Sequence, residues 1–531
     1  MQLSVWNGRG FTELTWDAWR AGSERSAAAL RALGVGPGTR VACILGNSRA
    51  VCTGAIGVWG AGGCIVSLPT IARAMQPADY VSALRRICRE AGAELLLAEE
   101  RYARDLEASG LLDLPVAAFE SLESGGGRTL APEPPAAHDV AFVQYSSGST
   151  ARPKGCVLTA GAIAAQVEAL AERLRLDGPA ERGVSWLPLS HDMGFFGCLL
   201  LSFATGMRLL LSSPGRFQRA PRTWLEDCER WRATISAGPN SGLDLVIRAV
   251  ELGAPERLEL RKLVLGGERV TLRTLSAAVR SLGPSGLDWR DLLPAYGLAE
   301  AVLAVTMKPV DEPPRVLHVG TDALLGGEVD VVADGYELGE REDAVACVSL
   351  GPPLRGTQVR VDGGGVGEVH VSSPSLASGY VGNPELTSER FTADGLRTGD
   401  LGFVRDGELF VVGRSDDMIC LGGRNIFASD VEAVLDRVAG VRPGSSVLVE
   451  VVDGRSQRIV ILAEPDDGRD HIEIAEALRS VATHATGLHP DECLLLDRGR
   501  LPKTPSGKVQ RFRCRQLAAA GEAAGVARVT F

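Results

Sequence analysis

Short apolar segments alternate with helical segments along most of this chain of 531 residues, and this alternation constrains the fold more than any other feature. In the first hundred residues, Ala-, Arg- and Glu-rich stretches of helical periodicity separate the apolar runs 40–46, 64–68 and 94–99. Similar runs, each bounded by Gly, Pro or Ser, lie at 184–189, 207–213, 234–238 and 262–267. A strand–helix–strand order of this kind predicts parallel sheets covered by helices.

The pattern changes after residue 300. Residues 308–343 are rich in Pro, Gly and acidic residues, as an insertion would be, and apolar and polar residues alternate in several runs after them. Such alternation is typical of antiparallel sheets. From about residue 415 an α+β pattern begins. We therefore expect an α/β fold with a large N-terminal domain of doubly wound parallel sheets and a small α+β C-terminal domain joined by a hinge. The expected bounds are 1–414 for the N-terminal domain, about 308–343 for its insertion, about 344–414 for its β-rich subdomain, and 415–531 for the mobile C-terminal domain.

Composition excludes several classes of protein. The 66 Asp and Glu outnumber the 56 Lys and Arg, and a net charge of -10 is the wrong sign for a nucleic-acid-binding protein. The 11 Cys are scattered singly with no C-x-x-C pair, so neither a disulfide framework nor a zinc site is predicted. The N-terminal residues do not match a signal peptide, and we expect a cytoplasmic protein.

Residues 50–72 carry no charge over a length that could span a bilayer. Gly62 and Gly63 divide this stretch into a helix-like half and a strand-like half. We therefore expect a buried helix, a turn and a buried strand rather than a membrane span.

The most informative segment is YSSGSTARPKG at 145–155, which follows an apolar strand and precedes a helix that opens near Ala160. Gly and small hydroxyl residues let backbone N–H groups approach a phosphate closely, and a Lys adds a charged donor. The segment therefore predicts a phosphate-binding loop, although it does not match the G-x-x-x-x-G-K-[ST] pattern. A Ser- and Gly-rich surface turn is the alternative. The candidate phosphate-binding residues are Ser146, Ser147, Gly148, Ser149, Thr150 and Lys154.

Together with motifs further along the chain, this segment resembles the adenylate-forming superfamily of acyl-CoA synthetases, nonribosomal-peptide adenylation domains and firefly luciferases. The resemblance extends from about Thr12 to Gln516 and is closest to fatty acyl-AMP ligases. The loop differs from the family pattern only at Ala151, where Gly is usual, and the resemblance makes Thr150 a catalytic candidate.

The segment WLPLSHDMGFFG at 186–197 resembles the acyl-AMP ligase version of the next motif and implies that His191 lies at the carboxylate pocket. A His beside a phosphate and a carboxylate neutralises developing charge or orients the acid, which makes His191 a second catalytic candidate. The alternative is a helix-capping Asp192 beside a packed His.

Two further segments, 263–270 and 292–305, resemble the strand ends that hold adenine and the α-phosphate. The resemblance implies that Tyr296 lies against adenine and that Glu300 binds Mg²⁺, a cation that prefers oxygen ligands. A Glu that only stabilises a helix N-terminus is the alternative for Glu300. The other nucleotide-binding candidates here are Gly266, Gly267 and Gly297.

The last two motifs lie at 397–425 and 501–511. The resemblance implies that Asp400 accepts hydrogen bonds from the ribose hydroxyls, that Arg414 adds a donor nearby, and that Asp416 is the hinge. It also implies that Lys508 reaches the acyl carboxylate and the α-phosphate, where a cation stabilises the transition state. A solvated basic tail is the alternative for the arginines around Lys508.

The reaction implied by the resemblance joins a carboxylic acid to ATP, with Mg²⁺, to give an acyl adenylate and pyrophosphate, and a thiol then takes the acyl group. His191-Asp192 and the long stretch from Glu300 to Gly351 favour a carrier protein over free CoA, because such an insertion is thought to hinder acyl-CoA formation in acyl-AMP ligases. The basic run 498–515 would suit an acidic carrier protein.

The identity of the acid is less constrained. Residues 237–248 resemble the helix that lines the acyl tunnel, with small residues where bulkier ones are common. The substrate-pocket candidates are His191, Gly197, Asn240, Ser241 and Gly242. We expect a medium or long fatty acid, and a short, aromatic or unusual acid of secondary metabolism stays open. An acyl-CoA ligase is the second hypothesis and a non-catalytic nucleotide-binding relative the third.

Overall fold

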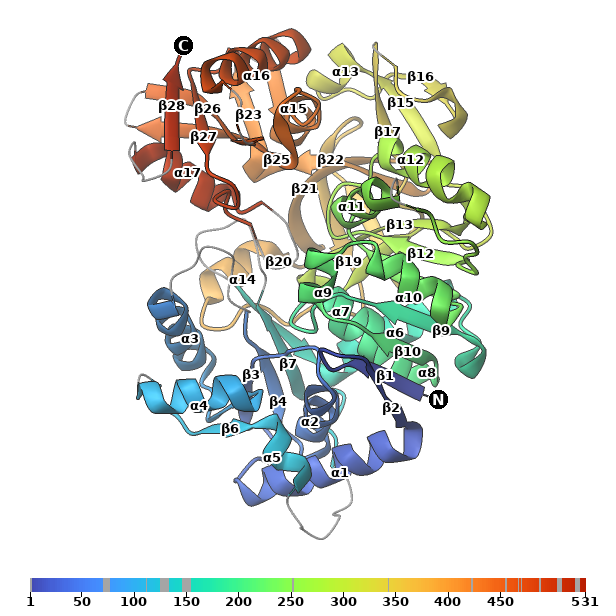
Figure 1. The fold of residues 1–531 in the computed structure, drawn as a ribbon, viewed down its shortest axis with the longest axis vertical. Coiled ribbons are helices and arrows are strands. Elements are labelled where there is room, and N and C mark those ends of the chain that lie inside the picture. Colours follow the sequence, from blue (N-terminus) through green and yellow to red (C-terminus); the bar gives the residue numbers. More distant parts are fainter. Residues whose placement is uncertain are drawn as a thin grey trace.

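The computed structural model describes residues 2–69, 77–110, 112–124, 133–145, 154–250, 253–341, 343–421, 424–453, 456–466, 468, 470–486, 489–503, 509–520 and 526–531. Two largely parallel sheets with covering helices form the N-terminal part, antiparallel sheets follow, and an α+β unit lies at the C-terminal end (Figure 1). The expected mixed α/β fold is thus confirmed.

The first sheet has the strand order β6-β5-β3-β4-β7-β8, in which β8 is antiparallel to β7 and the other pairs are parallel. Fully buried residues make up β4 and β5, as expected for strands covered on both faces. Residues 50–69 form helix, turn and buried strand as predicted. The strands are β3 (Arg40–Cys43), β4 (Cys64–Ser67), β5 (Leu95–Ala98), β6 (Val116–Ala118), β7 (Val140–Tyr145) and β8 (Gly155–Thr159).

The second sheet has the order β14-β13-β12-β11-β9-β10-β1-β2, with antiparallel strands only at its two edges. Parallel strands end at a common edge, so the loops after β9, β12 and β13 lie near one another. The strands are β1 (Gln2–Trp6), β2 (Phe11–Thr15), β9 (Arg182–Ser185), β10 (Arg208–Leu211), β11 (Ile235–Gly238), β12 (Lys262–Leu265), β13 (Leu292–Gly297) and β14 (Ala304–Met307).

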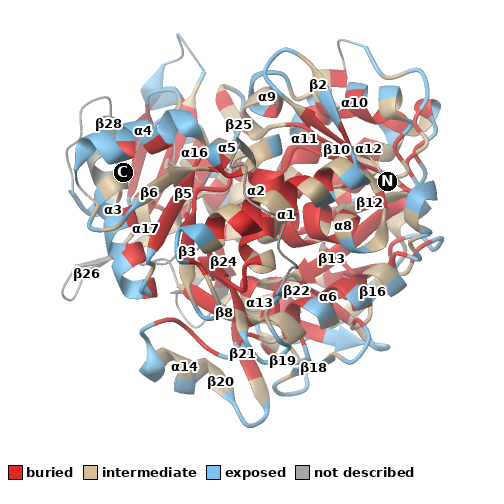
Figure 2. Cartoon of the chain, turned by 90° about the horizontal axis from the view of Figure 1, so that it is seen from below, coloured by how far each residue is buried: buried red, intermediate tan, exposed pale blue. Residues whose placement is uncertain are grey.

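Helices cover both sheets, and buried residues concentrate where helices and strands meet (Figure 2). Polar caps fix several helix starts: Ser48 accepts from Val51 N, and Thr159 accepts from Ala162 N. Among the described residues, no helix is long and apolar enough to cross a membrane. The helices of this part are α1 (Trp16–Ala32), α2 (Arg49–Gly60), α3 (Pro77–Ala91), α4 (Glu100–Ser109), α5 (Phe119–Ser124), α6 (Ala160–Arg173), α7 (Asp192–Gly194), α8 (Leu201–Thr205), α9 (Pro214–Arg219), α10 (Thr223–Trp231), α11 (Asn240–Val250) and α12 (Leu272–Leu282).

Antiparallel sheets follow the second parallel sheet. The segment predicted as an insertion forms much of an ordered sheet of order β16-β15-β17, and the β-rich subdomain pairs β18, β19, β21, β20 and β22. The elements are β15 (Val316–Gly320), α13 (Thr321–Leu325), β16 (Val331–Asp334), β17 (Ala344–Val348), β18 (Gln358–Val361), β19 (Gly367–Ser372), α14 (Pro384–Arg390), β20 (Phe391–Thr392), β21 (Gly395–Arg405) and β22 (Glu408–Arg414).

The C-terminal part has its own buried cores, built on a sheet of order β25-β26-β27-β28. It lies beside α13 in Figure 1, and Leu325 of α13 packs against one of its cores. Its elements are β23 (Met418–Leu421), β24 (Arg424–Phe427), α15 (Ala428–Leu435), β25 (Val441–Asp453), β26 (Ser456–Pro465), α16 (His471–Thr486), β27 (Glu492–Leu496), α17 (Arg511–Ala520) and β28 (Val526–Thr530).

Candidate active site

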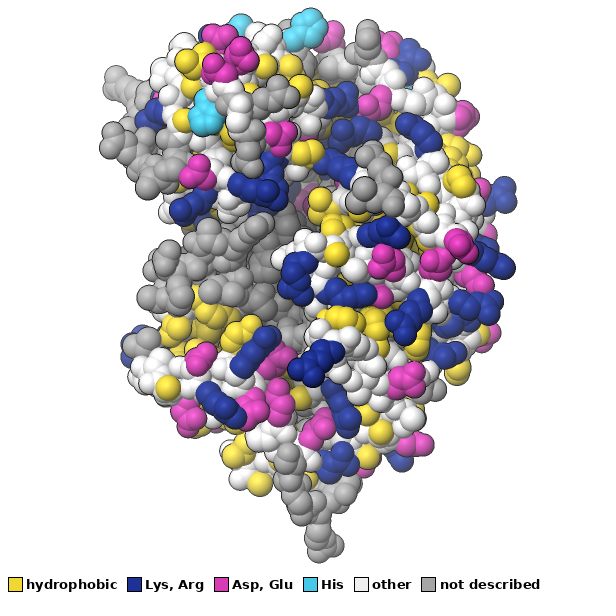
Figure 3. All heavy atoms as spheres, in the orientation of Figure 1, with side chains coloured by type: hydrophobic (Ala, Val, Ile, Leu, Met, Phe, Trp, Pro, Cys, Tyr) yellow, Lys and Arg dark blue, Asp and Glu magenta, His cyan; other side chains and the backbone are white. Residues whose placement is uncertain are grey.

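A cavity of about 2550 Å³ opens at the carboxyl ends of the second sheet, between that sheet, the β-rich subdomain and the C-terminal part. Its lining includes residues from the loops after β9, β12 and β13 and from β21, β22 and the start of α17. On the face shown in Figure 3, Lys and Arg side chains lie along the groove between the C-terminal part and the rest of the molecule. The cavity therefore joins segments far apart in the sequence.

Tyr296, Asp400 and Arg414 form one contact group in this cavity. The Tyr296 hydroxyl donates to Asp400 Oδ2 at 2.5 Å, and Arg414 Nε lies 3.1 Å from Asp400 Oδ1. Adjacent strands hold the pair, because Asp400 of β21 lies opposite Arg414 of β22. The structure thus brings together three residues predicted to bind the nucleotide.

The carboxyl of Asp400 lies largely out of water. Burial raises the pKa of Asp400, and the Arg414 guanidinium and the Tyr296 hydroxyl partly oppose that rise. Burial and the neighbouring carboxylate also raise the pKa of Tyr296, which keeps its hydroxyl protonated as a donor. The Asp400 carboxylate is therefore a hydrogen-bond acceptor that is already in place, and its ionisation lowers the stability of the folded state.

Glycines make room where the two strand ends approach the cavity. A Cβ on Gly297 would lie 1.9 Å from Leu303 O, and one on Gly266 would lie 2.9 Å from Ala295 O. Gly267 has a φ of +78°, which L side chains adopt rarely. The predicted glycines thus serve close backbone packing at the cavity edge.

A tight loop after β13 presents Glu300. Leu298 N donates to Leu303 O at 2.8 Å, which closes the loop around a short 3₁₀ turn, Ala299–Ala301. Val302 in this loop has a φ of +65°, a strained conformation for a β-branched residue. Such strain is concentrated at functional sites, where the surrounding structure enforces it.

The Glu300 carboxylate meets Tyr380, which none of the sequence motifs indicated. The Tyr380 hydroxyl donates to Glu300 Oε1 at 2.8 Å. Lys154, at the end of the predicted phosphate loop, has its Nζ 5.8 Å from the centre of the Tyr380 ring. A carboxylate and a cation suited to phosphate chemistry therefore both contact one tyrosine.

His191 lies at the start of α7, held by its neighbour. Its Nδ1 lies 2.5 Å from Asp192 Oδ1, and Asp192 Oδ1 also accepts from Met193 N at 2.7 Å. Side chains of β4 and β7 hold the turn before His191 in place, because Ser67 and Gln144 both donate to Ser190 O. The helix cap is His191 itself, whose Nδ1 accepts from Met193 N at 3.4 Å, and not the Asp192 expected in the alternative. Asp192 accepts from the same N–H and lies against the imidazole at the cavity.

A π-helix, Phe195–Leu200, follows α7 directly. π-Helical turns are rare and are frequent at functional sites. This turn carries Gly197, whose Cβ would lie 2.9 Å from a Leu303 methyl group. Burial raises the pKa of Cys198 to about 11, so its thiol is protonated at neutral pH.

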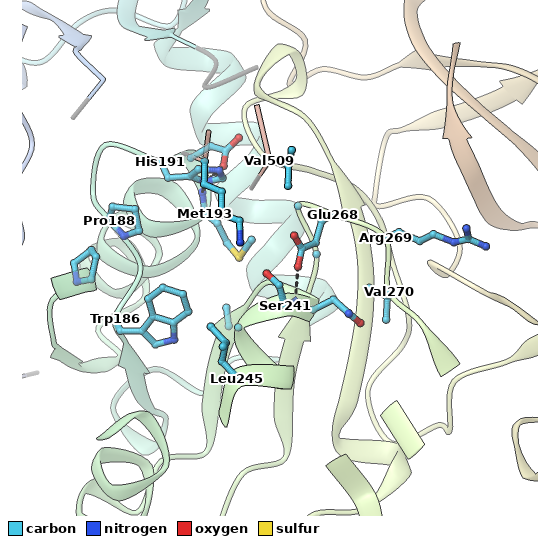
Figure 4. A pocket seen from close by; sticks show the side chains of 18 of the residues that line it. Trp186, Pro188, His191, Met193, Ser241, Leu245, Glu268, Arg269, Val270 and Val509 are labelled. Carbon is cyan, nitrogen blue, oxygen red and sulfur yellow. Dashed lines mark hydrogen bonds and ion pairs between the residues drawn. The ribbon is translucent and has the colours of Figure 1, made fainter. Parts of the chain in front are cut away.

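The apolar end of the cavity is built around Trp186 (Figure 4). The Trp186 ring stacks on Phe217 with centroids 3.7 Å apart, and Trp224 packs edge-on against both rings. A Cβ on Gly242 would lie 3.0 Å from Trp186. The indole of Trp186 leaves little room for a side chain at position 242. The glycine at this position therefore does not imply an open pocket.

The N-terminus of α11 is tied to the neighbouring strand end. Ser241 N donates to the Glu268 carboxylate, as Figure 4 shows, and Asn240 Oδ1 accepts from Thr271 N at 3.1 Å. Asn240 also donates to Thr274 Oγ1 at 3.0 Å. Asn240 thus joins α11 to α12, while Ser241 lies on the cavity wall.

Several predicted site residues lie outside the described residues, namely Ser146, Ser147, Gly148, Ser149, Thr150 and Lys508. The backbone of Asp416 belongs to a 3₁₀ turn, Ser415–Asp417, between β22 and β23. Val509 and His191 both line the cavity (Figure 4). The described end of the closing motif thus borders the same cavity.

Comparisons with known proteins agree with this geometry. The family described as AMP-binding enzyme matches residues 4–381. A Caulobacter vibrioides protein, named provisionally as an acyl-CoA synthetase, is 33% identical over 466 residues, covering 83% of this chain and 79% of that protein. The medium-chain-fatty-acid–[acyl-carrier-protein] ligase JamA of Moorena producens is 32% identical over 402 residues, covering 71% of this chain and 67% of that protein.

A solved structure from work on the fatty acyl-adenylate ligases of E. coli and L. pneumophila has a TM-score of 0.87 to this structure at 25% identity. The similarity covers 98% of this chain and 96% of that one. The fold is therefore that of an adenylate-forming enzyme. The chain belongs to the AMP-binding enzyme family, is close to fatty acyl-AMP ligases, and is an AMP-forming ligase that activates a carboxylic acid with ATP.

Proposed function

We propose that the acid is a fatty acid of medium or greater length and that the acyl group passes to the phosphopantetheine thiol of a carrier protein. One observation carries the proposal for the reaction site: the Tyr296–Asp400–Arg414 group, Glu300 and His191 line a single cavity. The relatives named as fatty-acid and carrier-protein ligases support the choice of acid and acceptor.

In this proposal Asp400 binds the ribose hydroxyls of ATP and Arg414 adds a donor. The buried carboxylate is well suited, because charge-assisted hydrogen bonds are about twice as strong as neutral ones. The glycines at the two strand ends leave backbone close to the nucleotide. The loop at 146–150 and Lys154 hold the phosphates.

Glu300 is the proposed ligand of Mg²⁺. Its carboxylate fits a hard cation, because Tyr380 occupies only Oε1 and no other described residue donates to the carboxylate. Mg²⁺, when bound, would neutralise charge on the ATP phosphates.

His191 orients the substrate carboxylate, which attacks the α-phosphate, and Lys508 stabilises the charge that develops there. The chain supplies no nucleophile in this step. The described cysteines are buried, and Cys198, which lines the cavity, is protonated at neutral pH.

Contacts between the insertion and the C-terminal part support the carrier protein as acceptor. Leu325 packs against a C-terminal core, and Arg437 Nη2 lies 2.8 Å from Glu340 Oε2. In the proposed arrangement these contacts resist rotation of the domain 415–531 about Asp416, a rotation that acyl-CoA formation needs.

The experiment compares acceptors after acyl-adenylate formation with a series of fatty, β-hydroxy, amino and aryl acids. We expect acyl transfer to holo-carrier protein, no transfer to the apo-carrier, and little acyl-CoA. Efficient acyl-CoA formation without carrier transfer would establish the second hypothesis, an acyl-CoA ligase. A preference for aryl or short acids would replace the fatty acid.

A further inference from the structure

We propose that Tyr380 is a positioning residue: its hydroxyl holds one oxygen of the Glu300 carboxylate, so that the other oxygen faces the divalent cation that accompanies ATP. This inference rests on the proposed function, in which Glu300 is the metal ligand. It adds a residue from the β-rich subdomain to a site built mainly on the parallel sheets.

The contact is specific and largely out of water. Tyr380 is 7% exposed, and its hydroxyl donates to Oε1 of Glu300 at 2.8 Å. The backbone repeats the link, because Ala377 N donates to Glu300 O at 2.7 Å. Side chain and main chain of 377–380 therefore both fix the 3₁₀ turn that presents Glu300.

The segment that carries Tyr380 is itself anchored to the strand that leaves the predicted phosphate loop. Val157 N donates to Gly379 O at 3.0 Å, and Val381 N donates to Gly155 O at 2.9 Å. Tyr380 N donates to Thr387 Oγ1 at 2.9 Å, and the ring packs edge-on against Phe391. The hydroxyl thus reaches Glu300 from a rigid base.

This arrangement decides how the carboxylate can act. A carboxylate that is fixed through one oxygen offers the other as a single, oriented ligand, whereas a free one rotates. The groups that orient a metal ligand typically change metal affinity by about 10–100-fold when removed. Lys154, whose ammonium lies against the Tyr380 ring, gives the same tyrosine a contact with the phosphate-binding side.

The test uses Tyr380→Phe, which removes the hydroxyl and keeps the ring that packs on Phe391 and Lys154. Mn²⁺ binding in the presence of a non-hydrolysable ATP analogue is measured by electron paramagnetic resonance. We expect the Kd for Mn²⁺ to rise by about 10-fold. We also expect high Mg²⁺ to restore activity, and the KM for the acid to stay unchanged.

Tyr336→Phe is the matched control, because Tyr336 packs on Trp289 away from the cavity and should leave the Mn²⁺ affinity unchanged. A Tyr380→Phe affinity within twofold of the wild type would overturn the inference. The inference would also be overturned if Tyr380→Phe lowered the Mn²⁺ affinity by the same factor in a Glu300→Ala background. In that case Tyr380 would act on metal binding without Glu300. If Glu300→Ala itself leaves Mn²⁺ binding unchanged, the proposed metal ligand is wrong as well.

Discussion

Asp400 is a residue of this site whose ionised form lowers the stability of the fold. Its carboxyl is buried beside Tyr296 and Arg414, and burial raises its pKa. A raised carboxyl pKa means that stability falls as the pH rises above the ordinary Asp value, so at pH 7 the ionised group costs folding energy. In the proposed function the ionised carboxylate of Asp400 accepts hydrogen bonds from the ribose hydroxyls, and such charge-assisted bonds are stronger than neutral ones.

We therefore predict opposite effects of Asp400→Asn on binding and on stability. The KM for ATP should rise by about 10-fold or more, since a hydrogen bond to a charged group contributes about 1.5–3 kcal/mol. The Tm should stay at or above the wild-type value, because the buried charge is gone. Steady-state kinetics and thermal unfolding check both effects, and an unchanged KM for ATP would remove Asp400 from the nucleotide site.

Among the helices and strands, glycines allow aromatic side chains to fill the apolar end of the cavity. Gly238 ends β11, and a Cβ there would lie 2.6 Å from the Trp224 ring. The Trp224 indole N–H donates to Ser236 Oγ at 2.8 Å, so the ring is held on both sides. Overpacking at such a position costs about 1–3 kcal/mol.

Gly238→Ala should accordingly lower the free energy of unfolding by about 1–3 kcal/mol. Gly36→Ala is the matched control, because a Cβ at Gly36 would meet no atom within 4 Å. Denaturant unfolding of both variants measures the difference. Equal free energies of unfolding for Gly238→Ala and Gly36→Ala would show that the Trp224 ring moves aside without destabilising the protein.

The helix α15 carries a buried carboxyl that makes stability depend on pH. Burial raises the pKa of Glu432 to about 7, against the opposing effect of Arg511, with which it forms an ion pair. The folded state holds this proton to higher pH than the unfolded state does. Stability from this group is therefore present below the ordinary Glu value and is lost as the pH rises toward about 7.

We predict that Glu432→Gln flattens this dependence. Between about pH 5 and about pH 7.5 the wild type should lose about 2 kcal/mol more unfolding free energy than the variant. The difference between the two slopes is the quantity to measure, because the variant also loses the pair with Arg511. Parallel slopes would contradict a raised pKa for Glu432.

In the molecule as a whole, the insertion, together with β17 of its sheet, contacts both the helix α12 of the second parallel sheet and the C-terminal part. Apolar packing and an ion pair between described residues join it to that part: Leu325 packs against a C-terminal core, Leu317, Val319 and Leu324 share a second cluster with Phe427, and Glu340 pairs with Arg437. The pair is half exposed and contributes about 1 kcal/mol at most, so the apolar contact carries more weight.

The double variant Leu325→Asp, Glu340→Arg should free the C-terminal part. We expect adenylation at the wild-type rate and an increase in acyl-CoA formation, measured with ATP, acid and free CoA. Asp343→Arg serves as the control, because Asp343 pairs with Arg341 inside the insertion. An unchanged preference for the carrier protein in the double variant would mean that the insertion does not select the acceptor.

The order of strands and helices could be predicted from the sequence because local periodicity encodes it. The residues 64–67 form the predicted buried strand, and α6 begins at Ala160 as expected. Motif order likewise led to Tyr296, Asp400 and Glu300. Tyr380 was missed because its bond to Glu300 joins residues 80 positions apart, and neither local periodicity nor a short motif encodes such a contact.

The same limit applied to pocket size. Gly242 is one of the small residues in the segment that resembles the acyl-tunnel helix, and in the structure Trp186 from another strand end packs against it. The type of a residue is read directly from the sequence, but the side chains that pack against it come from distant positions and are known only from the structure. The size of the acid could therefore not be predicted from these small residues, because an aromatic ring distant in the sequence determines the space beside Gly242.

Acid activation at this cavity is tested by acid-dependent exchange of labelled pyrophosphate into ATP, measured for the wild type and for Glu300→Ala. We predict exchange that requires an added carboxylic acid, peaks at one fatty chain length, needs no thiol, and falls by about 100-fold or more in the variant. Exchange that is absent with every acid, or that is equal in Glu300→Ala, would show that this cavity does not activate a fatty acid through Glu300.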